Sequence, residues 1–265
     1  MILIPGLSLG AGTRFGSTSA GPDADATAIV TAITEAGGTV PDGADTAIQT
    51  FVKGLKSSGA WNAIFHMWGF VGANAASHAL DWRNFGGNSI SWNGTLLHDA
   101  IGTKGDGSGY GDTTMDPSLG ASRDDFHFAS YVPVDDGGDG MQAGLTNEVT
   151  SLFLGVSTNG NFDCQCGDST THTQLTNSNG GIGLINSAGV TQNIYHAGTL
   201  INSLTVSGDL PAEYNLYVCA VDDLGSATSF SAEYISFLSY GRHIPNPASF
   251  QTLVQNLQTA LGRAV

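Results

Sequence analysis

The sequence predicts a mainly β fold, in which an antiparallel β-sandwich over residues 61–246 follows a helical hairpin and precedes a single helix. Between 61 and 246 the apolar residues recur in short alternating runs, separated by Gly, Asn and Asp. Helical spacing occurs only before and after this region, so the strands lack the intervening helices of a parallel α/β sheet. Glycine accounts for 37 of 265 residues, about twice its usual share of roughly 7%, which is typical of a chain with many turns.

The helical hairpin is predicted over residues 23–60. Asp23 and Asp25 stand where carboxylates cap the free N–H groups of a first turn, and Gly37 follows as a stop. A second helix over about 44–58 ends before Gly59. Its apolar residues fall at i, i+3, i+4 and i+7 and form one face: Ile48, Phe51, Val52 and Leu55.

The C-terminal helix is predicted over 247–265, with Asn246 as N-cap and Pro247 at the first helical position. An isolated helix of this length is marginal in water. Its apolar stripe is therefore expected to be buried against the sandwich or a neighbouring subunit. The stripe consists of Phe250, Leu253, Val254, Leu257 and Leu261.

The strands of the sandwich are predicted from period-two alternation. In the stretch 126–134, Phe126 and Phe128 fall on one side and His127 and Ala129 on the other. Further strands are predicted at 148–156, 182–187, 191–196, 199–206, 213–221 and 229–239. Many short strands at this spacing indicate a sandwich or barrel.

Residues 1–22 are predicted to form an extended arm, with a disordered terminus as the alternative. The arm is too rich in Gly and Ser to bury its aliphatic side chains in a core of its own. It is therefore expected to contact another surface through Ile2, Leu3, Ile4 and Leu7.

The net charge of −15 and the 8 Lys and Arg residues, which form no basic cluster, exclude sequence-independent nucleic-acid binding. Anionic membrane surfaces are disfavoured for the same reason, and no apolar run approaches the roughly 20 residues of a membrane span. The start of the chain lacks the pattern of a secretory signal. The three cysteines are expected to be reduced thiols. A metal site at Cys164 and Cys166 with His172 is the alternative.

Three stretches together resemble a group of phage virion proteins whose main domain is a concanavalin-type, laminin-G-like jelly roll. They are AIQTFVKGLKSSGAWNAI at 47–64, FVGANAASHALDWRN at 70–84 and SFQTLVQNLQTALGRAV at 249–265. The matching residues are Leu55, Lys56, Gly59 and Trp61, then Phe70, Val71, Gly72, Ser77 and His78, then Gln258, Thr259, Leu261, Gly262 and Arg263.

The resemblance spans about residues 23–265 and matches only in style over 100–240. It implies a jelly-roll fold and a place in the virion, as a tail-fibre, head-fibre or capsid-decorating protein with other virion proteins as partners. It implies no catalytic residues. By analogy with phage fibres it also implies a homotrimer, in which 23–60 serves as the attachment or oligomerisation segment.

Catalysis is not expected from the sequence. Glycoside hydrolysis needs two carboxylates, which sandwich-fold glucanases usually place in a Glu-x-Asp-x-x-Glu pattern. None of the four glutamates belongs to such a pattern. No Ser-His-Asp motif, Gly-x-Ser-x-Gly motif or nucleotide loop is present. We therefore predict that the chain is not an enzyme and has no cofactor.

Two acidic, Gly-rich segments are candidates for calcium, which prefers oxygen ligands. The first contains Asp135, Asp136 and Asp139, and the second runs from Gly105 to Asp112. The alternative is solvated turns that use Asp and Gly for their backbone preferences. An EF-hand is excluded, because its twelfth position would be Thr146 rather than Glu.

The remaining candidates are more typical of structural residues. His78 is expected to be packed. The four tryptophans could stack on sugars, but they are expected in the core or an interface: Trp61, Trp68, Trp82 and Trp92. The sequence thus predicts a structural component of a phage virion. The alternative is a carbohydrate-binding module that recognises a host surface glycan.

Overall fold

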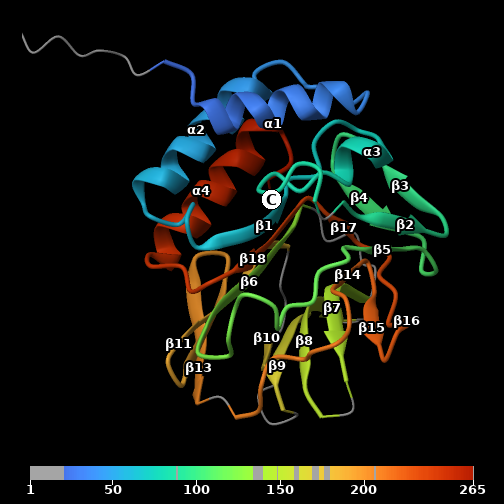
Figure 1. The fold of residues 1–265 in the computed structure, drawn as a ribbon, viewed down its shortest axis with the longest axis vertical. Helices are drawn as coiled ribbons and strands as arrows, with labels where there is room; N and C mark the ends of the chain where they lie inside the picture. The colour runs from blue at the N-terminus through green and yellow to red at the C-terminus, as the bar shows by residue number, and fades with distance from the viewer. Residues whose placement is uncertain are drawn as a thin grey trace, which may run out of the picture.

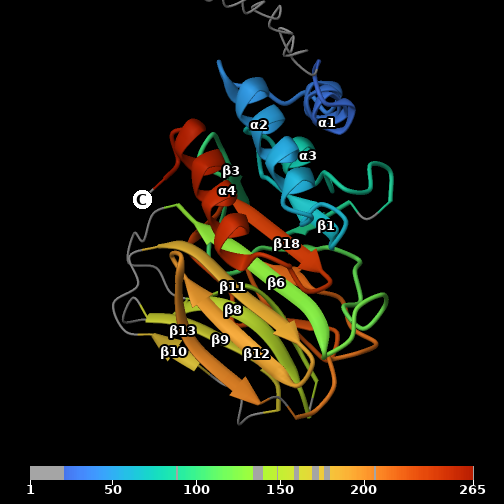
Figure 2. The same ribbon diagram turned by 90° about the vertical axis from the view of Figure 1, so that its left-hand side faces the viewer.

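The computed structural model describes residues 21–87, 89–133, 140–147, 149–157, 161–168, 173–175, 180–205 and 207–264. As predicted, the fold is an antiparallel β-sandwich with helices packed on one side (Figure 1). The layers follow one another as helices, a six-stranded sheet called sheet A, and a larger sheet called sheet B (Figure 2).

Sheet A has six antiparallel strands. Its first and second strands come from opposite ends of the chain. In spatial order the strands are β1 (Ile64–Trp68), β18 (Phe237–Gly241), β6 (Asp125–Val132), β11 (Gly181–Ala188), β12 (Thr191–His196) and β13 (Thr199–Thr205).

Sheet B forms the other layer. Its main path is β10 (Thr173–Leu175), β9 (Asn161–Gly167), β8 (Ser151–Ser157), β7 (Gly140–Thr146), β14 (Tyr217–Val218), β5 (Tyr110–Asp112) and β2 (Ser91–Asn93). Off this path, β15 (Val221–Asp223) pairs in parallel with β7 and antiparallel with β16 (Ser226–Thr228). A small third sheet contains β17 (Tyr234–Ile235), β4 (Thr103–Gly105) and β3 (Leu96–His98).

The helices are α1 (Ala24–Glu35), α2 (Ala44–Ser57), α3 (Ala75–His78) and α4 (Pro247–Ala260). Asp23 caps α1 and Asn246 caps α4, as predicted. The expectation that helices occur only outside 61–246 is wrong, because α3 lies within that range. A side-chain cap from Asn74 stabilises this single turn, which is too short to show a helical period. No helix among the described residues is long and apolar enough to span a membrane.

Both faces of sheet A are buried, so the molecule has two apolar cores. On β6, Phe126 and Phe128 face the core between the sheets, whereas Ala129 and Tyr131 face the core beneath the helices. A strand covered on both faces has no side exposed to solvent, which is why every residue of β6 from Phe126 to Val132 is buried. The apolar face of α2 also packs into the helical core.

The stripe of α4 is buried in the same core, as predicted, except at Leu253 and Leu261, which are half-buried. Phe250, Val254 and Leu257 are at most 2% exposed, and each such burial contributes about 1.5–3 kcal/mol before entropy. Leu253 is only half-buried, because it lies beside a groove that remains open between α2 and α4.

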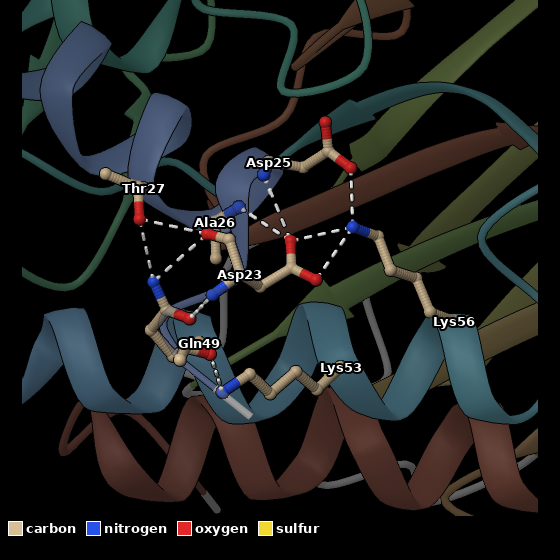
Figure 3. Close-up of polar contacts among 8 residues, drawn as sticks. Asp23, Asp25, Ala26, Thr27, Gln49, Lys53 and Lys56 are labelled. Atoms are coloured by element: carbon tan, nitrogen blue, oxygen red, sulfur yellow. Dashed lines mark hydrogen bonds and ion pairs between the residues drawn. The ribbon is translucent and has the colours of Figure 1, made fainter. Parts of the chain in front are cut away.

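Polar contacts tie the start of α1 to α2 (Figure 3). The Lys56 ammonium lies 2.7 Å from Asp23 Oδ1 and 2.6 Å from Asp25 Oδ2. The hydrogen bond from Lys56 lowers the pKa of the Asp23 carboxyl. One turn earlier, Lys53 donates a 3.1 Å hydrogen bond to the Gly21 carbonyl. The described chain therefore enters the fold along the surface of α2.

Candidate functional site

The candidate site lies on the face of sheet B that points away from the inter-sheet core. Successive side chains of a strand point to opposite faces, and Leu152, Leu154 and Val218 fill the core. Phe153 and Tyr217, their neighbours within the same strands, therefore face outward. One row of paired residues crosses this outward face: Gln165, Phe153, Gly144, Tyr217, Asp112 and Ser91.

An aromatic cluster of Tyr110, Tyr217 and Phe230 lies on this face where β5 pairs with β14. The rings of Tyr110 and Tyr217 stack with centroids 4.7 Å apart and planes 29° apart. Phe230 lies 6.3 Å from Tyr110 between centroids. Tyr217 is almost fully covered, whereas Tyr110 and Phe230 are partly exposed. Tyr110 and Phe230 thus expose part of an aromatic surface, and the Tyr110 ring packs on the buried ring of Tyr217.

Two carboxylates and an amide lie beside the aromatic cluster. The Asn215 side chain donates a 3.3 Å hydrogen bond to Asp112 Oδ2, and its backbone N–H donates a 3.1 Å bond to Asp222 Oδ2. The backbone N–H of Thr114 donates to Asp112 Oδ1 at 2.7 Å, and that of Gly225 donates to Asp222 Oδ1 at 2.7 Å. Residues from three distant parts of the chain are therefore held in one polar cluster.

The negative charge of this cluster favours ligand groups that donate hydrogen bonds. Burial raises the pKa of the Asp222 carboxyl, and the nearby Asp112 charge raises it further. Burial also raises the pKa of the Tyr217 hydroxyl to about 12, together with the charges of Asp222 and Asp112. A raised pKa keeps the Tyr217 hydroxyl protonated, so it is not an activated nucleophile.

A ligand with many hydroxyl groups matches the chemistry of this face. Each carboxylate oxygen of Asp112 can accept a second hydrogen bond besides the one it already receives. Aromatic ring faces pack on apolar C–H surfaces. No group of three or more His, Cys, Asp or Glu side chains among the described residues is arranged to hold a metal ion.

The predicted calcium and interface candidates have different outcomes. Asp135, Asp136 and Asp139 lie outside the described residues, as do Ile2, Leu3, Ile4, Leu7 and His172. In the second acidic segment, Asp106 Oδ1 accepts hydrogen bonds from the backbone N–H groups of Ser108 and Gly109, as expected of a turn. The same segment supplies Tyr110 and Asp112 to the candidate site.

His78 is packed, as predicted, and lies in a junction between residues 69–103 and the C-terminal end of the described chain. Its Nδ1 lies 2.9 Å from the Thr103 hydroxyl. Nearby, the buried Arg263 guanidinium donates to the carbonyls of Gly69 and Phe70 at 3.0 Å each and of Ile101 at 3.3 Å. Two of the stretches that carry the family resemblance therefore meet in a structural junction.

The other candidates are structural as well. Trp61, Trp68 and Trp82 are buried, and Trp92 is half-buried with its indole N–H donating to the Ala75 carbonyl at 2.8 Å. The three cysteines are free and buried. Burial raises the pKa of each thiol, to about 12 for Cys166 and Cys219.

Sequence reasoning missed Asn215, Tyr217, Asp222 and Phe230. Tyr217 falls within the predicted strand 213–221, but its pairing with Asp112 joins residues more than 100 positions apart. The adjacent Asp222 and Asp223 at a strand end were the available signal. Without a known strand order, nothing connected them to the segment around Tyr110.

No family model matches the sequence, and no curated protein matches it. Among solved structures, the chain is similar to domain 4 of AbnA, a GH43 extracellular arabinanase from Geobacillus stearothermophilus, in complex with arabinotriose. The TM-score is 0.50 at 15% identity, covering 72% of this chain and 98% of that domain. It is also similar to Trypanosoma rangeli sialidase, with a TM-score of 0.52 at 14% identity, covering 81% of this chain and 38% of the sialidase. The chain covers 24% of NanB sialidase from Streptococcus pneumoniae, with a TM-score of 0.39.

These matches contradict the prediction that the chain is not an enzyme, because the proteins that share its fold include a sialidase and a domain of an arabinanase. The prediction relied on a missing glutamate pattern within one strand. Carboxylates from separate strands can meet without any such pattern, as Asp112 and Asp222 do around Asn215. At 14–15% identity the comparisons show the fold, an antiparallel β-sandwich that also occurs in proteins acting on glycans.

Proposed function

We propose that this protein binds a neutral glycan on the outward face of sheet B. The observation that carries the proposal is the stacked pair Tyr110 and Tyr217 beside the carboxylate of Asp112. Sugars have apolar C–H faces and hydroxyl edges. A partly exposed ring next to hydrogen-bond acceptors is complementary to both, because a few placed polar groups fix the orientation of a ligand held on an apolar surface.

Charge favours a neutral glycan over an acidic one. The chain carries a formal charge of −15, and the site itself contains Asp112 and Asp222. A carboxylate or sulfate on the ligand would face like charges at short range. Neutral hydroxyl groups would instead donate to these carboxylates, and hydrogen bonds to charged groups contribute about 1.5–3 kcal/mol each.

The comparison with the arabinanase domain supports this choice. That domain has the same fold over 98% of its length, and its structure is a complex with arabinotriose, an uncharged sugar. The likeness supplies no residue correspondence at 15% identity, so the residues proposed here rest on the geometry of this chain alone.

The virion setting remains a prediction that rests on the sequence resemblance. In that setting the glycan would belong to the host surface, and the module would serve adsorption. The helices and the outward face of sheet B lie on opposite sides of sheet A (Figure 2). An attachment through the helical side would therefore leave the proposed glycan site accessible.

Binding to an array of neutral and acidic glycans tests the proposal, using the full chain and two site variants. We expect neutral ligands to be retained, and Tyr110→Ala and Asp112→Asn each to weaken binding at least about tenfold, or roughly 1.4 kcal/mol. Phe85→Ala is the matched control, because it removes an exposed aromatic ring elsewhere. Equal binding by all variants, or binding of acidic glycans only, would refute the proposal. Release of reducing ends in the same samples would show that bound glycan is also cleaved.

A further inference from the structure

An open apolar groove runs between α2 and α4, outside the proposed glycan site. Its volume is about 210 Å³. Phe51 and Leu257 are buried in its floor, and Ala47 and the half-buried Leu253 form its walls. The two helices approach closely further along, where a Cβ on Gly54 would overlap the Leu253 side chain. The groove is therefore a gap in an otherwise tight helix pair, lined by aliphatic and aromatic carbon.

The segment that precedes the described chain has the composition to fill such a groove. Residues 1–20 lie outside the described residues and begin with Met-Ile-Leu-Ile-Pro-Gly-Leu. Burying an Ile or Leu side chain gives one of the largest stabilising contributions that a single apolar residue can make to a folded core. A glycine- and serine-rich tail cannot bury these side chains against one another.

The chain leaves the body beside the groove. The Lys53 ammonium, on the surface of α2, donates a hydrogen bond to the Gly21 carbonyl. Lys53 follows Thr50 and Thr46, which line the groove, by three and seven residues, so all three share one helix stripe. Two helical turns correspond to about 10 Å. A fully extended chain spans at most about 3.3–3.6 Å per residue, so residues 8–20 are long enough to reach the groove.

Charge also favours this contact. Arg14 is the only charged side chain in residues 1–20, whereas all 23 acidic residues follow it. Two of them, Asp42 and Asp45, are exposed at the start of α2, next to the groove residues Gly43 and Thr46. The positively charged arm is therefore attracted to the acidic side chains beside the groove.

We propose that residues 2–7 dock in the α2–α4 groove of their own chain, with Ile2, Leu3 and Ile4 against Phe51, Leu253 and Leu257. Docking in the same chain is favoured over exchange between copies, because a short covalent connection raises the effective concentration of the arm at its own groove to the millimolar range. The arm thereby completes the helical core.

Distance measurement between two spin labels tests the proposal on the full chain. One label is placed by Ser8→Cys in the arm and one by Thr259→Cys, which is exposed on α4 and does not line the groove. The three native thiols are buried, with raised pKa values, so they do not compete for the label. We expect a single short separation. The double change Ile2→Ser and Ile4→Ser should lower the docked fraction at least about tenfold.

Two further variants separate docking from a change of fold. Phe15→Ser removes an apolar side chain outside residues 2–7 and should leave the separation unchanged. Thr50→Trp is designed to fill the groove from its exposed rim and should displace the arm without altering circular dichroism. A broad distance distribution in the parent chain, or a short separation that survives both arm serines, would overturn the proposal. A mixture of chains that each carry only one of the two labels is the last control. A short separation in this mixture would also overturn the proposal, because it would mean that the arm docks on a second copy of the chain.

Discussion

Lowering the pH from 7 to 5 tests the burial of two histidines, His78 and His127. Both are 0% exposed. The Nδ1–H of His127 donates to the Arg242 carbonyl at 2.6 Å, and its Nε2 lies 3.2 Å from the Ser239 hydroxyl. Burial lowers the pKa of His127 to about 4. Burial also lowers the pKa of His78 to about 3, with contributions from the nearby His98 and Arg263.

The sign of the effect follows from proton linkage. Each folded-state pKa lies below the value of about 6.5 for an unfolded chain. The unfolded state therefore binds more protons across the window from about pH 6.5 down to 4, and the free energy of unfolding falls as the pH falls. Between pH 7 and 5, each histidine lowers the free energy of unfolding by about 2 kcal/mol, so the pair lowers it by roughly 4 kcal/mol. The lowered pKa values of His98 and His196 act in the same direction.

Urea unfolding at pH 7.0, 6.0 and 5.0 measures this loss. Near pH 5 the two histidines together predict a slope of about 2–3 kcal/mol per pH unit. His127→Gln should remove about half of that slope, whatever its own effect on stability at pH 7. A flat free energy of unfolding between pH 7 and 5, or a slope unchanged by the substitution, would refute the assignment of these histidines as buried and neutral.

Three further outcomes are expected. Gly69→Ala should destabilise the fold by about 1–3 kcal/mol, because its Cβ would overlap the Trp82 ring; an unchanged melting temperature would contradict the packing. Arg263→Met should cost about 2–4 kcal/mol, since it leaves buried carbonyls unsatisfied; an unchanged urea midpoint would show that the junction contributes little. The three thiols should react with Ellman's reagent at pH 8 only after denaturation, because they are buried with raised pKa values; a thiol reacting stoichiometrically in the native protein would contradict their burial.

The helices could be predicted because their signals are local. Asp23 and Asn246 cap the helices that directly follow them, and apolar spacing marks the buried faces. The short helix α3 could not be predicted, since one turn held by Asn74 has no period to detect. The exposed side of Leu253 could not be predicted either, because it depends on how far α2 and α4 separate at that point.

Only part of the candidate site could be predicted from the sequence. The Gly-rich acidic segment drew attention to Asp112 as a calcium candidate, but its role changes once Tyr217 is seen to pair with it across sheet B. Likewise, Arg263 belonged to a recognisable C-terminal pattern, and its three carbonyl partners emerge only when the ends of the chain are brought together. In both cases the missing information was the order of strands that are distant in sequence.

The pairing of β1 with β18 has a consequence for biosynthesis. β18 lies between β1 and β6 in sheet A, so, among the strands that the structure describes, β1 has none to pair with until residues 237–241 have been made. At about 5–20 residues per second, a ribosome takes on the order of 10–30 s to cover that interval. During this time Met67 and Trp68, which are fully buried in the finished fold, have no partner strand beside them. Pairings of such long sequence separation also form slowly. Production of the folded protein should therefore depend on holdase chaperones acting on the N-terminal half, more than its modest length suggests.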